Sequence, residues 1–304
     1  MKTISYIALV IALLTSCTRI IDIDLADQPE TRLVVEGSVM HYLNNPDSSY
    51  QEIMLSQSRS YFDNVEEDNS VSGAVVKVKN IDTDEEVLFQ ESVDVKGLYF
   101  TNDLKGIVGH TYQLNIETTL DNELQTFEAI DKIPFEAPNI DSIILKRETS
   151  FLGGDIIYEI TIDALNDPSQ HEYFKFETFI NDQLVKGDND NPNFFNHLID
   201  DAFFGDSISQ FQITDYRIND EDNDIKIQLV PPFQIEVTME SINQKSYNFW
   251  RKLYVNALSG SDTPQTEVRG SVNNLTYDDR YALGTFMCGS KSRRKQTITA
   301  FPTE

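Results

Sequence analysis

Most of the chain alternates hydrophobic and polar residues in short segments, separated by Gly, Asn, Asp and Pro. In residues 76–79, two valines alternate with two lysines, which is typical of a strand with one buried and one solvated face. This pattern predicts strands over residues 33–39, 51–56, 74–80, 87–91, 97–100, 110–118 and 124–129. Short strands at this density, over roughly 100 residues, predict a β-sandwich.

A second region begins after Pro134 and Pro138, because proline cannot continue a central strand. Alternation resumes there, and in residues 156–162 three isoleucines and a tyrosine share one face. Strands are predicted over 140–146, 156–162, 172–180, 208–214, 224–230, 234–239, 282–288 and 295–301. The fold class is therefore all-β, with two domains expected over 30–135 and 138–304.

Glycine and tyrosine mark one hairpin of the first region. The sequences Gly97-Leu98-Tyr99 and Gly109-His110-Thr111-Tyr112 end and begin adjacent predicted strands. They look like a hairpin of immunoglobulin-like and transthyretin-like secreted modules. We therefore expect residues 30–135 to form such a sandwich, and residues 138–304 to form a second β-sandwich or a barrel-like domain.

One segment, from about 241 to 258, has helical periodicity instead. Ser241 and Gln244 match a capping box, and apolar residues such as Trp250 and Tyr254 recur at helical spacing up to Leu258. The segment predicts one amphipathic helix packed on a sheet. Its aromatic stripe is interpreted as core, and Trp250 is the candidate contact if the stripe instead docks a partner.

The N-terminus predicts export and a lipid anchor. Lys2 precedes an apolar run over 4–14 that is too short to span a bilayer, so residues 1–16 are expected to be a signal peptide. The sequence Leu-Thr-Ser-Cys at 14–17 resembles a bacterial lipobox, in which the thiol of the cysteine is acylated and the peptide is cut before it. Cys17 would then carry the lipid, and residues 17–29 would form a tether.

Charge and cysteine content narrow the function classes. The net charge is -26, and it becomes -27 once Lys2 is removed, which argues against binding nucleic acid. The basic cluster at 291–295 is expected to be one solvated face of a hairpin. The other cysteine, Cys288, has no intramolecular partner if Cys17 is acylated, and its apolar neighbours predict a buried structural thiol.

No familiar catalytic or cofactor motif occurs in the sequence, and the four histidines (41, 110, 171 and 197) are far apart. We therefore expect no enzyme and no cofactor, with an unrecognised hydrolase as the less favoured alternative. Two acidic loops, at 187–192 and 219–224, are candidate calcium sites. Asp220, Asp222 and Asp224 resemble the start of a calcium loop, but the required Gly and Glu are missing, so solvated turns are expected instead.

Two serines match a short acceptor pattern for O-glycosylation of exported proteins, Asp followed by Ser and an aliphatic residue. They are Ser142 and Ser207, each followed by isoleucine. Because such three-residue matches also arise by chance, they stay candidates.

The order of several motifs resembles one protein family. The lipobox stands close to Ile-Asp-Ile-Asp at 21–24, and Leu-Val-Val-Glu-Gly at 33–37, Ile-Asp-Ser-Ile at 140–143 and Leu-Gly-Thr-Phe at 283–286 follow. The chain resembles the Bacteroidota outer-membrane lipoproteins known as domain of unknown function 4249. The resemblance implies a lipoprotein found as a companion of TonB-dependent receptors, with no reaction assigned.

The expected function is thus an outer-membrane lipoprotein, anchored through Cys17, that acts as an accessory or binding partner of a TonB-dependent β-barrel receptor. A structural or adhesive surface lipoprotein is the alternative. We favour the cell surface over the periplasmic face. The sequence does not indicate the cargo or the oligomeric state.

Overall fold

The computed structural model describes residues 31–45, 47–58, 68–149, 156–185, 197–217, 230–258, 268–278 and 280–302. They belong to the larger of the chain's two compact units, which comprises residues 31–59 and 64–304. The predicted signal peptide, Cys17 and the tether lie outside the described residues. The same holds for the loop at 187–192, for Asp220, Asp222 and Asp224, and for most of the strand predicted over 224–230.

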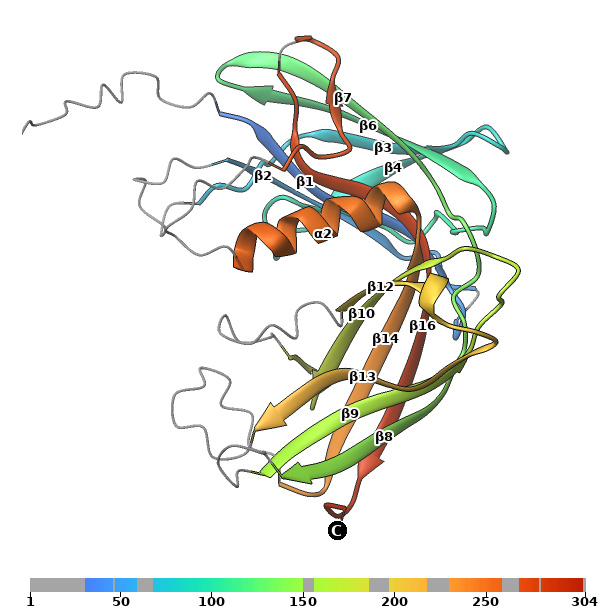
Figure 1. The fold of residues 1–304 in the computed structure, drawn as a ribbon. Coiled ribbons are helices and arrows are strands. Elements are labelled where there is room, and N and C mark those ends of the chain that lie inside the picture. Colours follow the sequence, from blue (N-terminus) through green and yellow to red (C-terminus); the bar gives the residue numbers. More distant parts are fainter. Residues whose placement is uncertain are drawn as a thin grey trace, which may run out of the picture. The chain divides into compact units, whose positions relative to one another are not determined.

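The fold is all-β, as the alternation predicted, and α2 (Gln244–Leu258) is the one α-helix in the described part of the chain. The larger sheet has the order β11-β10-β14-β16-β1-β2-β5-β4-β3-β6-β7-β15, with β12 paired to β10, and the smaller sheet has the order β13-β9-β8 (Figure 1). The strands are β1 (Leu33–Tyr42), β2 (Gln51–Gln57), β3 (Val75–Asn80), β4 (Glu85–Glu91), β5 (Leu98–Thr101), β6 (Thr111–Leu120), β7 (Glu123–Lys132), β8 (Ile140–Thr149), β9 (Ile156–Leu165), β10 (Tyr173–Ile180), β11 (Gln183–Leu184), β12 (Leu198–Asp200), β13 (Ser207–Arg217), β14 (Phe233–Ile242), β15 (Asn273–Asn274) and β16 (Leu283–Ile298).

The glycine and tyrosine motifs of the first region fix turns by hydrogen bonds from buried rings. The Tyr99 hydroxyl donates to Val71 O at 2.9 Å and accepts from Ala74 N at 2.9 Å. Gly97 has a φ of +74°, and a Cβ there would lie 2.4 Å from Leu55 O, so only glycine fits. Tyr112 closes the second turn by accepting from Ile107 N at 2.8 Å. The motifs are therefore structural.

Strand β16 corrects the prediction at the C-terminal end. The sequence suggested two strands, 282–288 and 295–301, with a basic hairpin between them, but the structure has one strand of 16 residues. Its basic residues lie opposite acids of β14, where Glu240 pairs with Lys291 and Glu236 with Lys295. These cross-strand pairs let the strand continue through a segment whose local sequence resembles a turn.

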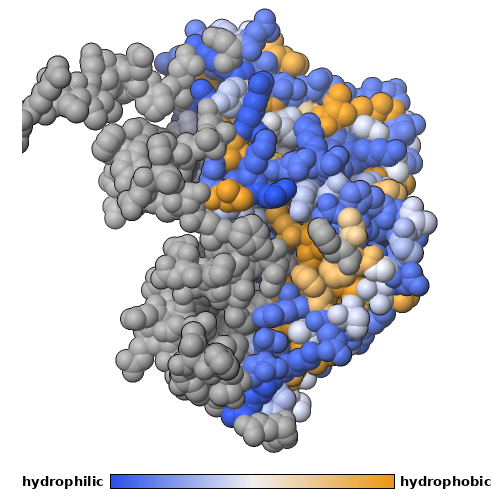
Figure 2. Space-filling model, in the orientation of Figure 1, coloured by the Kyte–Doolittle hydropathy of each residue, from blue (hydrophilic) through white to orange (hydrophobic). Residues whose placement is uncertain are grey.

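Two main cores lie between layers of strands. The first is built by β1 to β7 together with Val272, Ala282, Phe286 and Cys288, and the second by β8, β9, β10, β13 and β14 together with Ile298. Up to β14, the strands before residues 135–138 thus build the first core and the strands after them build the second. Strand β16 contributes residues to both cores. It pairs with β1 in parallel and with β14 in antiparallel orientation. Figure 2 shows that hydrophilic side chains dominate the coloured surface on the displayed face.

Candidate functional site

Helix α2 begins at a cap that the sequence placed two residues too early. Ser241 belongs to β14, and the capping residue is Asn243, whose Oδ1 accepts from Ser246 N at 2.9 Å. The Asn243 amide also donates to Asp131 on β7, and the other carboxylate oxygen of Asp131 accepts from Cys288 N at 2.6 Å. Asn243 caps the helix in place of Ser241 because its side chain accepts a hydrogen bond from a free backbone amide of the first turn and links the helix to two strands.

The inner face of α2 packs on a small third core that contains Met40, Tyr173, Ile242 and Met287. Trp250 lies against this core and is partly buried, and its indole Nε1 donates to Met287 Sδ at 3.5 Å. The ring of Tyr247 lies 4.7 Å from that of Tyr173. The structure thus places Trp250 on the side of the helix that faces the sheet, where it contributes to packing.

Below Trp250 lies the ion cluster, which consists of Lys175, Glu177, Glu240 and Lys291 on β10, β14 and β16. Lys175 Nζ lies 2.7 Å from Glu177 Oε1 and 3.2 Å from Glu240 Oε2, and Lys291 Nζ lies 2.8 Å from Glu240 Oε1. Burial alone would raise the pKa of Glu240, but the two ammonium groups lower it below its usual value. Lys175 also lies 5.3 Å from the centroid of the Trp250 ring.

The opposite face of α2 borders a groove of about 420 Å³ that we call the basic groove. Its lining residues are Gln244, Lys245, Asn248, Phe249 and Lys252 on α2, and Arg269, Gly270, Ser271 and Thr285 on the other side. Lys245, Asn248, Phe249 and Lys252 fall on one helical face because they are three and four residues apart. Ser271 is held to β16, since its hydroxyl accepts from Phe286 N at 2.8 Å.

Charge distinguishes this groove from the rest of the protein. Helix α2 contains no acidic residue, although the whole chain has 50 Asp and Glu. Lys245, Lys252 and Arg269 form no ion pair with any described residue, although the charge of Lys245 helps to lower the pKa of the buried Asp131 against the effect of burial. Sequence reasoning missed this site, although the acid-free helix was its signal.

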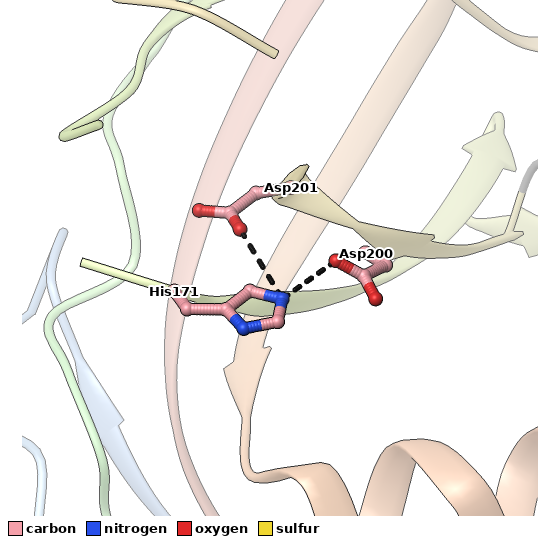
Figure 3. A group of neighbouring side chains, drawn as sticks. All are labelled: His171, Asp200 and Asp201. Atoms are coloured by element: carbon pink, nitrogen blue, oxygen red, sulfur yellow. Dashed lines mark hydrogen bonds and ion pairs between the residues drawn. The ribbon is translucent and has the colours of Figure 1, made fainter. Parts of the chain in front are cut away.

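A second group of polar side chains lies where β12 pairs with β10 (Figure 3). His171 Nε2 lies 2.7 Å from Asp200 Oδ1 and 3.8 Å from Asp201 Oδ1. Asp200 accepts this hydrogen bond and raises the pKa of His171, and it also caps the short helix η2 (Asp201–Phe203). The neighbouring Glu172 is buried, which raises the pKa of its carboxyl to about 7. Sequence reasoning did not find this group, because 29 residues separate His171 from Asp200.

The other sequence candidates have different surroundings. The Ser142 hydroxyl on β8 donates to Asp163 Oδ2 at 2.7 Å, whereas Ser207 is exposed at the start of β13. Cys288 is fully buried, as predicted, and burial raises the pKa of its thiol. None of these residues lies among those lining the basic groove.

The remaining three histidines have structural hydrogen bonds. His41 Nδ1 lies 3.0 Å from Gly106 O, His110 contacts the Asn80 side chain, and His197 Nδ1 lies 3.3 Å from Phe176 O. His171 is thus the histidine that meets carboxylates within the described residues.

A family model described as a domain of unknown function, DUF4249, matches residues 18–295. The chain belongs to this family. The match spans nearly the whole chain and confirms the resemblance that the order of motifs indicated. The description of the family names no activity, so the function of this DUF4249 protein has to be argued from its own residues.

Other comparisons add little to the picture of this DUF4249 protein. A comparison with curated proteins found no match. Among solved structures, one similar chain comes from the crystal structure of the chicken CNTN1 FN1-FN3 domains, with 13% identity and a TM-score of 0.27. The similarity covers 69% of this chain and 60% of that chain. A likeness at this level gives no information on function.

Proposed function

We propose that this DUF4249 protein is an outer-membrane lipoprotein, anchored through Cys17, that binds a small anionic ligand in the basic groove and works beside a TonB-dependent receptor. The observation that carries the binding role is the groove of about 420 Å³ with three cations that form no ion pair with the described residues. Two further features support the anchor and the receptor.

The anchor is supported by the signal sequence and the Leu-Thr-Ser-Cys motif at 14–17. Two or three acyl chains, each methylene contributing about 0.8 kcal/mol when buried, would hold the protein on the membrane. No helix among the described residues is long and apolar enough to cross a bilayer. The receptor is supported by the resemblance to lipoproteins that accompany TonB-dependent receptors.

The size of the basic groove favours a small molecule over a protein segment. Ligand pockets typically have volumes of about 300 to 1,000 Å³, whereas a stable protein interface buries about 800 Å² on each partner. The groove falls within the first range. A ligand with several carboxylate or phosphate groups would suit it, because arginine and lysine bind these groups through charge-assisted hydrogen bonds.

The overall charge of -26 does not prevent an anion from binding there. At physiological ionic strength the Debye length is about 8 Å, so exposed charges farther away are largely screened. Among the described residues that line the basic groove, the charges that set its local field are those of Lys245, Lys252 and Arg269. The side-chain amides of Gln244 and Asn248 offer hydrogen bonds beside them, whereas the hydroxyls of Ser271 and Thr285 lie 3.1 Å apart and contact each other.

The test is thermal unfolding of the purified protein with citrate as the anionic probe, against sodium chloride of equal ionic strength. Citrate at about 100 times its dissociation constant should stabilise the wild-type protein by about 2.7 kcal/mol. Lys252→Glu should lose this effect, because it reverses one charge of the groove. Arg251→Glu is the matched control, since Arg251 is exposed on the same helix but does not line the groove.

Equal citrate stabilisation of the two variants would contradict the assignment of the groove, and so would a wild-type protein that responds to citrate no more than to chloride. Phosphate in place of citrate tests whether the groove prefers carboxylates.

A further inference from the structure

The polar group on β12 and β10 has the ligand chemistry of a metal site. His171 offers an imidazole nitrogen, and Asp200 and Asp201 each offer a carboxylate oxygen, with these three atoms within 4.8 Å of one another. Figure 3 shows both carboxylates directed at the same ring nitrogen of His171. The pairing of Tyr173 with Asp200 across β10 and β12 fixes the two backbones that carry them.

Asp201 supplies an independent indication that a cation belongs there. Its side chain is 3% exposed, and its Oδ2 is buried without a hydrogen-bond partner in the described structure. A buried carboxylate with an unsatisfied oxygen is costly unless a charge or a donor compensates it. Among the described residues, the one cationic group within ion-pair distance of Asp201 is the imidazole of His171, whose Nε2 lies 3.8 Å from Oδ1.

Glu172 deepens the local deficit of positive charge. Its carboxylate is buried beside Asp201 and receives one side-chain hydrogen bond, from Ser241 Oγ at 3.3 Å, and it forms no ion pair with a described lysine or arginine. The buried Asp201 and the partly exposed Asp200 thus face a single imidazole, that of His171. A bound dication would balance these charges where the described protein residues do not.

We propose that His171, Asp200 and Asp201 bind a divalent transition-metal ion of the zinc class. One nitrogen and two oxygens suit zinc, whereas calcium and magnesium prefer all-oxygen sites. Tetrahedral zinc with ligand bonds of about 2.0 Å places its ligand atoms about 3.3 Å apart. This spacing lies between the 2.7 Å and 3.8 Å that separate His171 Nε2 from the two aspartates, and all three ligand atoms lie within 4.8 Å of one another.

The ion would replace the proton that Nε2 shares with Asp200, leaving the imidazole neutral with its remaining proton on Nδ1. His171 and Asp200 are partly solvent-exposed, with side-chain exposures of 55% and 28%, so water can complete the coordination shell. Because the ligands come from both sides of the β10–β12 pairing, the metal would fasten this short edge strand to the sheet.

The experiment is a titration of the full-length protein, purified in detergent and stripped with a chelator, with zinc chloride by isothermal calorimetry. We expect one saturable site per chain and a rise in the unfolding temperature. His171→Ala should weaken zinc binding by more than about tenfold, since even the loss of a supporting group costs that much. His171 is exposed, so its removal should leave the fold intact, which circular dichroism checks.

Asp167→Asn is the matched control, because Asp167 is an exposed acid near the group but is not one of its three members. It should bind zinc like the wild-type protein, whereas Asp200→Asn should not. Zinc affinity that His171→Ala leaves unchanged would overturn the proposal, as would wild-type protein without a saturable site. Neither result depends on the basic groove, so a negative zinc titration would leave the citrate result, and the proposal for the groove, unaffected.

Discussion

The ion cluster beneath α2 makes a quantitative prediction, because its four charges balance only as a set. Lys175→Met would leave Glu177 and Glu240 with Lys291 alone, and Glu240→Gln would leave two lysines with Glu177. At 3.2 Å and an effective dielectric constant of about 20, the attraction between Lys175 and Glu240 is about 5 kcal/mol, which offsets the cost of removing both from water. Each single substitution should therefore lower the free energy of unfolding by about 3 to 5 kcal/mol.

The double variant Lys175→Met with Glu240→Gln should be much less destabilised than the sum of the two singles. It keeps Lys291 and Glu177, whose charged atoms lie 3.5 Å apart, so the remaining charge is balanced. Urea denaturation of all four proteins closes a double-mutant cycle, and we expect a coupling energy of about 2 kcal/mol or more.

Lys77 and Glu86 provide the matched control, because their charged atoms lie 3.0 Å apart and their side chains are 43% and 45% exposed. The same cycle there should give less than about 1 kcal/mol. If the buried cycle gives a coupling as small as the exposed one, the cluster is not the buried, interdependent set described above, and the reasoning is refuted.

Three other variants test separate parts of the account. Cys17→Ala should abolish the membrane-bound mature form, and a fatty-acid analogue that labels the variant as strongly as the wild type would disprove acylation there. Trp250→Ala should cost about 2 to 3 kcal/mol in urea denaturation, less than the 3 to 5 of a fully buried aromatic, because the indole is only partly buried; an unchanged midpoint would show that Trp250 does not contribute to packing. Burial raises the pKa of Glu172 from 4.5 to about 7, so stability present below pH 4.5 is lost as the pH rises through 7. At pH 8, in the presence of a chelator, the free energy of unfolding of Glu172→Gln should therefore be higher than that of the wild type by up to about 3 kcal/mol. If this difference is no larger at pH 8 than at pH 4, the assigned pKa shift is contradicted.

Local pattern was sufficient for the parts of the fold whose strands lie next to each other in sequence. The alternation at 76–79 gave β3 with its correct faces, and the glycine and tyrosine motifs gave the turns around Tyr99 and Tyr112. These features depend on neighbouring residues, which the sequence shows directly.

Features that depend on distant partners could not be predicted in the same way. The basic stretch at 291–295 looked like a turn because Glu236 and Glu240, which neutralise it, stand more than 50 residues earlier. His171, Asp200 and Asp201 meet through strand pairing, and Arg269 reaches the basic groove from beyond the C-terminal end of α2. The residues of each site become neighbours only when the strands pair into the sheet, so their proximity cannot be seen in the sequence.

Co-purification from native membranes tests the central claim, an anchored lipoprotein that works beside a transporter. The tagged full-length protein would be extracted in mild detergent, and the proteins that accompany it would be identified by mass spectrometry. The account predicts that a TonB-dependent β-barrel receptor accompanies the wild-type protein and is lost from Cys17→Ala. Repeated recovery of the wild-type protein alone, with no β-barrel partner, would contradict it.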